Sequence, residues 1–403
     1  MVSQKSIMTS PNRSTHRVAW LFPSLARGFY WHPVLAELAK QYPEMVTFTG
    51  HWTGYSSKYE GRFLVREVGK FQFIVASQSS SGYDRGFILP SLKIVPKLTA
   101  FKPDVIMTAA FSFWTLIAVL LKLLYRWKIV IVFDGVSSSM GGTRSKAHKF
   151  WRKFISTFSD AFITNSKSGK DYLIGQLGAD KNKVLSKPYE VPDSSLSSDN
   201  NTGKVSPFPW ARSGCPIFLS VGQLITRKGI FFLLDACRLL KDEGYRNLTL
   251  VIVGDGPLRP QLEEYSRSIG LEDSVHWEGW VNNELLGPYF QSADVFVFPT
   301  LEDIWGMAVL EAMLFEKPIL CSKEAGAAEL IKEGENGFVF DPTKPKVLAE
   351  LMKVFIDRPE LVRIMGEQSG RSIQHFTPEA TAKHLASVIE GVMSLTPQVI
   401  TSL

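Results

Sequence analysis

The sequence predicts an α/β protein built from two doubly wound parallel sheets. The 403 residues exceed what one hydrophobic core usually serves, so we expect two domains. Short β-branched runs alternate with helical patterns in both halves of the chain, as they do in a parallel sheet covered by helices. A polar, Pro- and Ser-rich stretch at residues 191–215 separates the two series and indicates a domain linker.

The predicted N-terminal domain covers residues 1–190. It opens with a strand from Arg17 to Phe22, a turn that contains Gly28, and a helix that begins near His32. No Gly-x-Gly-x-x-Gly follows this strand, so a dinucleotide fingerprint is absent. Gly28, His32 and Asp134 are candidates for a ligand site on this domain, because sites in α/β proteins gather at the carboxyl ends of strands. A lone histidine in such a position is, however, more often structural.

The apolar region from Val105 to Phe133 has two interpretations. The first is a membrane span, but Lys122, Arg126 and Lys128 interrupt it. We favour the second, in which a strand, a helix and a strand occupy residues 105–109, 113–127 and 129–133. Two stretches rich in Gly, Ser and Tyr, at residues 51–61 and 77–86, are predicted surface loops and candidates for contacting a second substrate.

Charge is unevenly distributed along the chain. Residues 1–200 contain 26 Lys and Arg against 13 Asp and Glu, whereas the net charge of the whole chain is only +6. This asymmetry indicates an anionic partner for the first half, although a merely solvated basic surface is an equal alternative. A basic amphipathic helix near residues 144–158 adds to the pattern. It could lie on an anionic membrane, but its aromatic stripe is more often core.

The predicted C-terminal domain covers residues 216–377, and a last helix within 378–403 is expected to cross back to the first domain. Five strands are predicted, at residues 217–221, 248–253, 275–277, 295–298 and 318–321. The turn after the first of these strands carries Arg227 and Lys228. The turn after the second carries Gly254 and Gly256, which could allow the backbone to approach a ligand closely.

An acidic loop and a helix follow the strand at 295–298. The loop contains Asp303, and Gly306 leads into a helix that carries Glu311 on or near its apolar side. Two cations, a helix N-terminus and two carboxylates suit a sugar nucleotide. The cations and the helix N-terminus would hold the diphosphate, Glu311 would accept from the ribose and Asp303 from the donor sugar.

These residues also carry a resemblance to a known family. The segments SVGQLITRKG, LVIVGDGP, VHWEGWV, ADVFVFPTLEDIWGMAVLEAM, KPIL and GAAELI resemble the retaining glycosyltransferases of family 4, which have the GT-B fold. The first half is similar more loosely, through its opening unit and TNSKSGKDYL. The family's diphosphate-binding lysine falls on Lys228, and its paired-glutamate motif falls on Asp303 and Glu311. The resemblance implies a donor site that includes Gly222, Gln223, Gly254, Gly256, Val281, Ile304, Trp305, Gly306 and Met307.

Three departures from the family pattern concern the donor sugar. Gln223 stands where the family usually has an arginine, and Arg227 is the candidate to replace that charge. Asp303 stands in place of the first glutamate, with Glu302 beside it. Asp134 lies where many members have a histidine.

The resemblance implies transfer of a hexosyl unit from a nucleoside-diphosphate sugar, with a UDP-sugar favoured, and with retention of configuration. The sequence contains no Asp-x-Asp pair, so we expect a metal-independent enzyme without a cofactor. The expected acceptor is lipid-linked or a polysaccharide or glycolipid. The alternatives are a non-catalytic module that binds a nucleotide sugar or an anionic surface, and a GT-B sugar-nucleotide epimerase.

Nucleic-acid binding is not expected, because the chain has no recognised module for it. The cysteines are Cys215, Cys237 and Cys321, an odd and scattered set that is typical of free thiols in a reducing compartment. The first seventeen residues lack the apolar core of a signal peptide. We therefore expect a cytoplasmic protein, with a peripheral position on the inner face of the membrane as an option.

Overall fold

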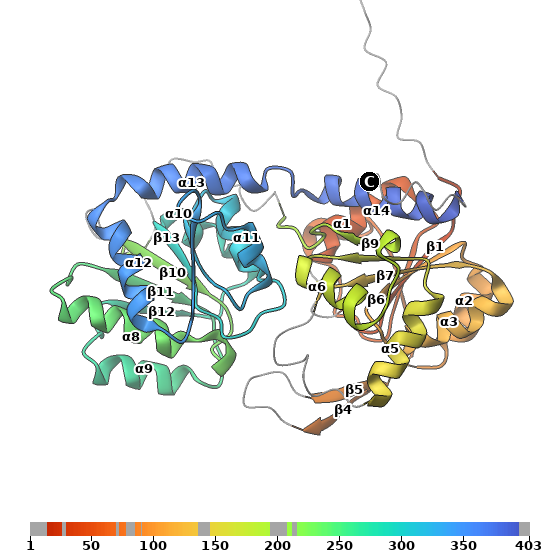
Figure 1. The fold of residues 1–403 in the computed structure, drawn as a ribbon, viewed down its shortest axis with the longest axis horizontal. Coiled ribbons are helices and arrows are strands. Elements are labelled where there is room, and N and C mark those ends of the chain that lie inside the picture. Colours follow the sequence, from red (N-terminus) through yellow and green to blue (C-terminus); the bar gives the residue numbers. More distant parts are fainter. Residues whose placement is uncertain are drawn as a thin grey trace, which may run out of the picture.

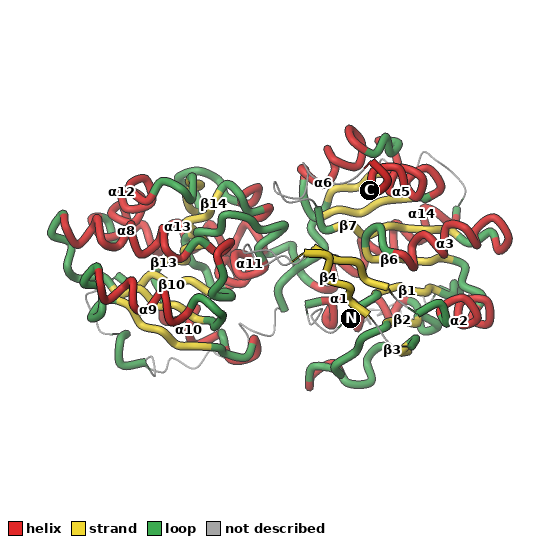
Figure 2. The backbone as a smooth tube through the Cα atoms, turned by 90° about the horizontal axis from the view of Figure 1, so that it is seen from below, coloured by secondary structure: helices red, strands yellow, loops and turns green. Residues whose placement is uncertain are grey.

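The computed structural model describes residues 14–25, 30–69, 72–77, 85–89, 91–135, 146–193, 208–211 and 216–394. Two parallel sheets lie side by side, and helices cover both faces of each (Figures 1 and 2). This arrangement confirms the predicted α/β architecture of two doubly wound domains. The carboxyl ends of the strands in both sheets supply the loops that meet between the domains.

The N-terminal sheet has seven parallel strands in the order β3-β2-β1-β6-β7-β8-β9. Their bounds are β1 Val18–Phe22, β2 Val46–Thr49, β3 Leu64–Glu67, β6 Val105–Ala109, β7 Lys128–Phe133, β8 Ala161–Thr164 and β9 Val184–Ser186. The helices are α1 Trp31–Gln41, α2 Ile94–Phe101, α3 Phe113–Tyr125, α5 Lys146–Phe158 and α6 Lys167–Asp171. A separate antiparallel pair, β4 Gln72–Ser77 and β5 Arg85–Leu89, flanks part of the predicted loop at 77–86.

The region from Val105 to Phe133 folds as β6, α3 and β7, in agreement with the strand–helix–strand interpretation. Ser112 caps α3 by accepting from the backbone N–H of Thr115, and the Thr115 hydroxyl accepts from the backbone N–H of Ser112 in return. β6 and β7 pair in parallel and are almost wholly buried. No helix among the described residues is long and apolar enough to cross a membrane.

The C-terminal sheet has six parallel strands in the order β12-β11-β10-β13-β14-β15. Their bounds are β10 Ile217–Val221, β11 Thr249–Val253, β12 Val275–Gly279, β13 Val295–Phe298, β14 Ile319–Ser322 and β15 Gly337–Phe340. The helices are α8 Ile230–Asp242, α9 Arg259–Ser268, α10 Gly287–Ser292, α11 Met307–Leu314, α12 Pro345–Asp357 and α13 Glu360–Ile373. The strand order reverses between β10 and β13, which makes their carboxyl ends the usual place for a ligand in such a sheet.

The last helix, α14 (Pro378–Met393), crosses from the C-terminal domain to the N-terminal one (Figure 1). Its buried face, which includes Leu385 and Ile389, belongs to the same hydrophobic core as Trp20 and Trp31. The Tyr42 hydroxyl at the end of α1 donates to the Glu390 carboxylate at 2.8 Å. The helix therefore crosses back to the first domain, as the sequence predicts.

Candidate active site

The site is built where β10 and β13 lie side by side. Beyond β10 the chain makes a short 3₁₀ turn, Thr226–Lys228, which ends at Gly229. Beyond β13 the acidic loop runs against that turn. The Thr300 hydroxyl donates to the carbonyl of Arg227 at 2.9 Å, and the backbone N–H of Leu301 donates to the same carbonyl at 2.7 Å. The backbone bonds of these two loops thus fix where their charged side chains meet.

Both cations of the turn converge on one carboxylate. Lys228 Nζ lies 2.6 Å from Asp303 Oδ2, and Arg227 Nη1 lies 3.3 Å from the same oxygen. Arg227 Nη1 also donates to the carbonyl of Glu302 at 3.3 Å. Because one carboxylate offsets two cations, these three side chains together carry a net positive charge at the end of the sheet.

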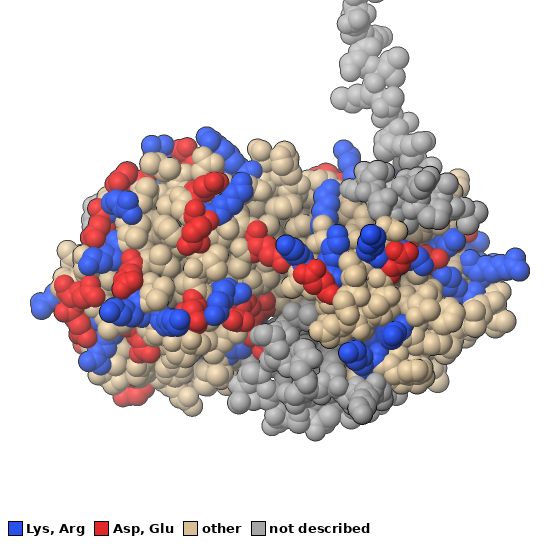
Figure 3. All heavy atoms as spheres, viewed as in Figure 1, with Lys and Arg blue, Asp and Glu red and all other residues tan. Residues whose placement is uncertain are grey.

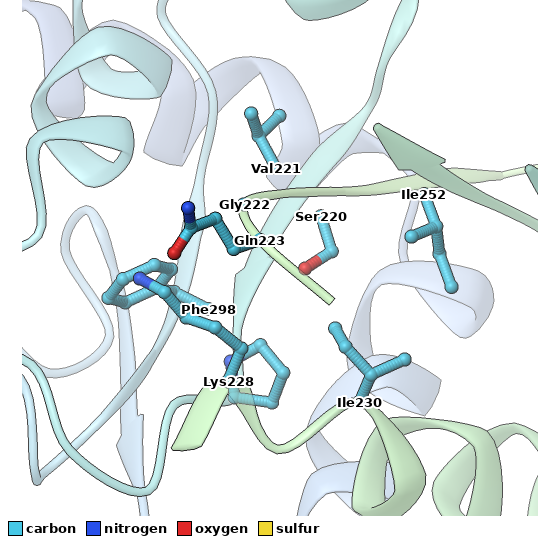
Figure 4. Close-up of a pocket in the computed structure, with 9 residues that line it drawn as sticks. Ser220, Val221, Gly222, Gln223, Lys228, Ile230, Ile252 and Phe298 are labelled. Atoms are coloured by element: carbon cyan, nitrogen blue, oxygen red, sulfur yellow. The ribbon is translucent and has the colours of Figure 1, made fainter. Parts of the chain in front are cut away.

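The Lys228 ammonium lies in a confined setting (Figure 4). It is 4.9 Å from the centre of the Phe298 ring, and its side chain lines a pocket of about 10 Å³ together with Gly222 and Gln223. Burial lowers the pKa of Lys228 from its ordinary value, and the nearby Asp303 carboxylate acts in the opposite direction. A partly desolvated ammonium interacts strongly with any anion that enters.

The glycines after β11 serve the packing of the protein itself. Gly254 adopts φ 141°, and a Cβ there would lie within 2 Å of the Gly222 carbonyl oxygen. A Cβ on Gly256 would meet the carbonyl oxygen of Leu224 at 2.5 Å. From the sequence, we expect these glycines to let the backbone approach a ligand closely. In the structure their close neighbours are backbone atoms of the turn after β10.

The loop from Asp303 to Gly306 is pinned on both sides. The backbone N–H of Asp303 donates to the carbonyl of Glu324, and the backbone N–H of Trp305 donates to Asp303 Oδ1 at 3.3 Å. Gly306, with φ 108°, leads into α11, and a Cβ at this position would press on the Phe298 ring at 3.0 Å. Glycine is therefore required where the loop becomes the helix.

Glu311 is buried on α11, and burial raises its pKa from 4.5 to about 7. A hydrogen bond from Asn283 partly opposes this shift. The neighbours of Glu311 on the same helix, Val309, Leu310, Ala312 and Met313, are also buried. A carboxylate on a helix that is covered on most sides needs a hydrogen-bond donor.

Glu311 and Met307 line a cavity of about 370 Å³ between the domains. The C-terminal domain contributes these two residues and Asn282, Asn283 and Glu284. The N-terminal domain contributes Tyr30, Pro33, Thr53, Tyr55, Ser56, Lys58 and Tyr59, and the beginning of the linker contributes Val191 and Asp193. The predicted loop at 51–61 therefore lies on this cavity, opposite α11.

Two acidic residues, Asp134 and Glu190, face the acidic loop. Only Asp134 was predicted from the sequence. Asp134, directly after β7, accepts a hydrogen bond of 2.5 Å from the Tyr189 hydroxyl. Burial and the neighbouring Asp134 raise the pKa of Glu190 well above its ordinary value, and burial also raises the pKa of Asp134. Glu190 lies at the predicted domain boundary, and its polar surroundings in the sequence gave no sign that it is buried beside the site.

The loop from Asp303 to Gly306, called the donor loop below, contacts the N-terminal domain directly. Trp305 Nε1 donates to the carbonyl of Glu190 at 3.1 Å. A Cβ on Gly135 would lie 3.4 Å from the Ile304 side chain. Ile304 and Trp305 thus lie at the boundary between the domains, whereas the resemblance assigned them to donor binding.

His32 is fully buried among aromatic rings, including those of Trp52 and Phe63. Because the backbone N–H of Ser56 donates to its Nδ1, this nitrogen accepts and the ring proton resides on Nε2. Burial lowers the pKa of His32 from 6.5 to about 4. The histidine supports the loop that lines the cavity but is not itself among the lining residues.

The remaining candidates divide as follows. Val281 is half-buried after β12, next to the asparagines that line the cavity. Gly28 lies outside the described residues. Within the described parts of the chain, no group of three or more His, Cys, Asp and Glu side chains is placed to hold a metal ion. Independence from metal remains a prediction.

Comparisons with known proteins agree with this geometry. The family model for glycosyl transferases group 1 matches residues 207–371, and the model for glycosyltransferase family 4 matches residues 30–186. Alpha-D-kanosaminyltransferase of Streptomyces kanamyceticus is 31% identical over 38% of this chain and 40% of its own length. D-inositol 3-phosphate glycosyltransferase of Streptomyces coelicolor is 26% identical over 57% of this chain and 55% of its own length.

The chain therefore spans about half the length of the curated relatives it matches. Among solved structures, Anabaena Alr3699/HepE in complex with UDP is similar with a TM-score of 0.73 and 18% identity, covering 93% of this chain and 100% of that one. Two doubly wound domains facing each other across a cavity define the GT-B fold. The chain belongs to the family 4 glycosyltransferases.

Proposed function

We propose that the protein transfers a hexosyl unit from a nucleoside-diphosphate sugar, with UDP-sugars favoured, to a lipid-linked, polysaccharide or glycolipid acceptor, with retention and without a metal. The observation that carries this proposal is the meeting of Lys228 and Arg227 on Asp303, where β10 and β13 diverge. The Anabaena structures with UDP and UDP-glucose support the choice of donor through the shared fold.

The two cations would neutralise the diphosphate. As the bond between the sugar and the diphosphate breaks, negative charge grows on the leaving phosphate oxygens. Lys228 is held in a preorganised and partly desolvated position, which suits this task without a metal ion. Arg227 adds the second charge from the next position of the same turn, and so would replace the arginine that is absent at Gln223.

The carboxylates would orient the donor. Glu311 faces the cavity from α11 and would accept hydrogen bonds from the ribose hydroxyls, while Asp303 would accept from hydroxyls of the sugar. The preceding Gly306 brings the N-terminus of α11 toward the same region, where its backbone N–H groups favour an anion. Held in this way, the anomeric carbon is presented to the N-terminal domain.

The reaction would proceed on one face of the sugar. The acceptor oxygen forms its bond to the anomeric carbon on the side from which the diphosphate leaves. The acceptor proton passes to a leaving phosphate oxygen, so no covalent intermediate on the protein is needed. The tyrosines and Lys58 of the cavity lie on the side where the acceptor would enter, and aromatic rings suit a sugar face.

The decisive experiment offers a panel of labelled sugar nucleotides to the protein together with lipid extracts and glycans. We expect label in an acceptor for one donor, with the anomeric configuration retained by NMR and the rate unchanged by EDTA. A donor that stabilises the protein without turnover would indicate a binding module. A new sugar nucleotide formed without acceptor would indicate an epimerase.

A further inference from the structure

We propose that α3 and α5 together form a docking face for an anionic lipid bilayer. The docking face consists of exposed apolar side chains on the C-terminal half of α3 and along α5, namely Leu120, Leu123, Leu124, Tyr125, Phe150, Trp151 and Phe158. Leu123 is 69% exposed and Leu124 is 76% exposed. Exposed apolar side chains in such number on two neighbouring helices are unusual for a surface that meets only water.

The two helices are joined into one surface. Lys122 of α3 donates to the carbonyl of Phe158 at the end of α5 at 2.8 Å, and pairs with Asp160 just beyond it. The aromatic rings of α5 continue the surface along that helix, because Phe154 contacts both Phe158 and Trp151. The exposed apolar side chains of α3 and α5 therefore belong to two helices that are joined at Lys122 and Phe158.

Only part of the apolar side of α5 packs against the core, where Ile155 is buried and Phe154 is partly buried. Arg152 turns inward, where it donates to the Tyr172 hydroxyl at 2.9 Å and lies 5.2 Å from the centre of the Phe111 ring. Phe150 and Trp151, in contrast, are 64% and 48% exposed. The sequence reasoning favoured this aromatic stripe as core, and the structure shows that much of it faces outward.

The charge around the docking face identifies the partner. Residues 113–160 contain eight Lys and Arg against two acidic residues, Asp134, which is bonded to Tyr189 in the active site, and Asp160, which is paired with Lys122. Lys149 and Lys153 are exposed on α5 beside the aromatic side chains. Figure 3 shows Lys and Arg among uncharged atoms over the visible part of this region, at the lower right. Apolar side chains surrounded by cations match an anionic membrane surface.

The alternative partner, a second copy of the chain, fits less well. A symmetric contact would bring two copies of the same basic surface together and cost like-charge repulsion. In a bilayer, Trp and Tyr side chains are favoured at the interface, Leu side chains enter the apolar layer, and Lys stems extend back to the lipid headgroups. The docking face and the lysines beside it contain side chains of all three kinds.

The test uses the full chain and sedimentation with lipid vesicles. Vesicles of phosphatidylcholine alone are compared with vesicles that also contain phosphatidylglycerol. We expect binding only to the second kind, with strong weakening between 0.1 M and 1 M salt, because the screening length falls from about 10 Å to about 3 Å. Equal binding to both kinds, or none, would overturn the proposal.

Two double variants separate the contributions. Lys149→Ala/Lys153→Ala should weaken binding roughly 25-fold, since each basic residue near such a surface is worth about a fivefold change. Leu123→Ser/Leu124→Ser should weaken it by at least about tenfold. The matched controls are Lys332→Ala/Lys346→Ala and Leu285→Ser, exposed positions in the C-terminal domain, which should bind as the wild type does.

Each outcome decides the question. Wild-type binding by both double variants, with unfolding temperatures intact, would remove α3 and α5 from the contact. A concentration-dependent dimer in analytical ultracentrifugation that Leu123→Ser/Leu124→Ser abolishes, without vesicle binding by the wild type, would assign the face to a second copy. The inference does not rest on the transfer reaction, so Lys228→Ala should bind vesicles normally even when turnover is lost.

Discussion

The indole of Trp305 donates a hydrogen bond to the backbone carbonyl of Glu190 and thereby joins the donor loop to the other domain. Trp305 is only 3% exposed, and it stands two residues after Asp303, the carboxylate that holds both cations. The position of the donor loop and the closure of the two domains are thus connected through one side chain.

Replacing this tryptophan should loosen the closed form. Trp305→Phe keeps an aromatic ring but leaves the Glu190 carbonyl without the indole N–H, which costs about 1–3 kcal/mol for a buried group. We expect a lower unfolding temperature by calorimetry and a lower kcat. Trp280→Phe, at an exposed tryptophan of the same domain, is the control. Unfolding identical to the wild type would show that the bond contributes nothing to closure.

Lys228→Ala removes the cation placed for the leaving diphosphate. We expect kcat to fall by about 10²–10³, the usual loss for one preorganised donor. Turnover is measured with the donor identified in the panel, and Lys346→Ala on α12 should leave it unchanged. A variant that turns over at the wild-type rate would refute the role of Lys228.

Glu311→Ala tests the ribose contact. Hydrogen bonds to a charged group contribute about 1.5–3 kcal/mol, so the affinity for free UDP should fall roughly ten- to hundredfold. Isothermal titration calorimetry measures the affinity, and Glu367→Ala, on α13, provides the comparison. Unchanged affinity would remove Glu311 from the nucleotide site.

The same residue should make stability depend on pH. Burial raises the pKa of Glu311 from 4.5 to about 7, so the folded protein binds this proton more tightly than the unfolded chain does. The stabilisation from this bound proton is complete below pH 4.5 and is lost as the pH rises through 7. Above pH 7 the free energy of unfolding is therefore lower by about 3 kcal/mol than at low pH, as far as this group is concerned. Glu311→Gln should therefore unfold at a higher temperature than the wild type at pH 8, and the difference should vanish near pH 5. A constant difference across this range would contradict the assignment.

Tyr42→Phe tests the attachment of α14. The Tyr42 hydroxyl is bonded to Glu390 and to the carbonyl of Ala386, and the side chain is almost fully buried. We expect a loss of about 0.5–1.5 kcal/mol in the free energy of unfolding, because the hydrogen bond from the buried Tyr42 hydroxyl to the half-exposed Glu390 carboxylate is removed. Chemical denaturation measures the loss. Tyr125→Phe, at a half-exposed ring on α3, should change stability little.

The fold could be predicted largely because apolar runs and turn residues are local signals. The strands around Trp20 and Phe296 are continuous buried runs, and the helix between β6 and β7 has both its cap and its period in the sequence. The pair β4 and β5 was missed, since its residues lie in and beside a Gly- and Ser-rich stretch that resembles a loop.

The candidate site could be predicted only in part. Lys228 and Asp303 were identified because each follows a strand whose place in the sheet the pattern implies. The position of Glu190 depends instead on how two domains close on each other, and no local pattern encodes that contact. The inward position of Arg152 was not predicted either, because the helical wheel of α5 does not show that a single basic side chain finds a partner, Tyr172, on the neighbouring helix.

The late position of α14 in the chain affects the order in which the protein can be made. Leu385 and Ile389 complete the core around Trp20 and Trp31, yet they leave the ribosome after the whole C-terminal domain has been synthesised. Until then the apolar surface beside α1 is uncovered, although domains usually fold one after another from the N-terminus. The first domain to be translated is therefore the last to be finished, and a chain that stops before residue 378 leaves it without its final helix.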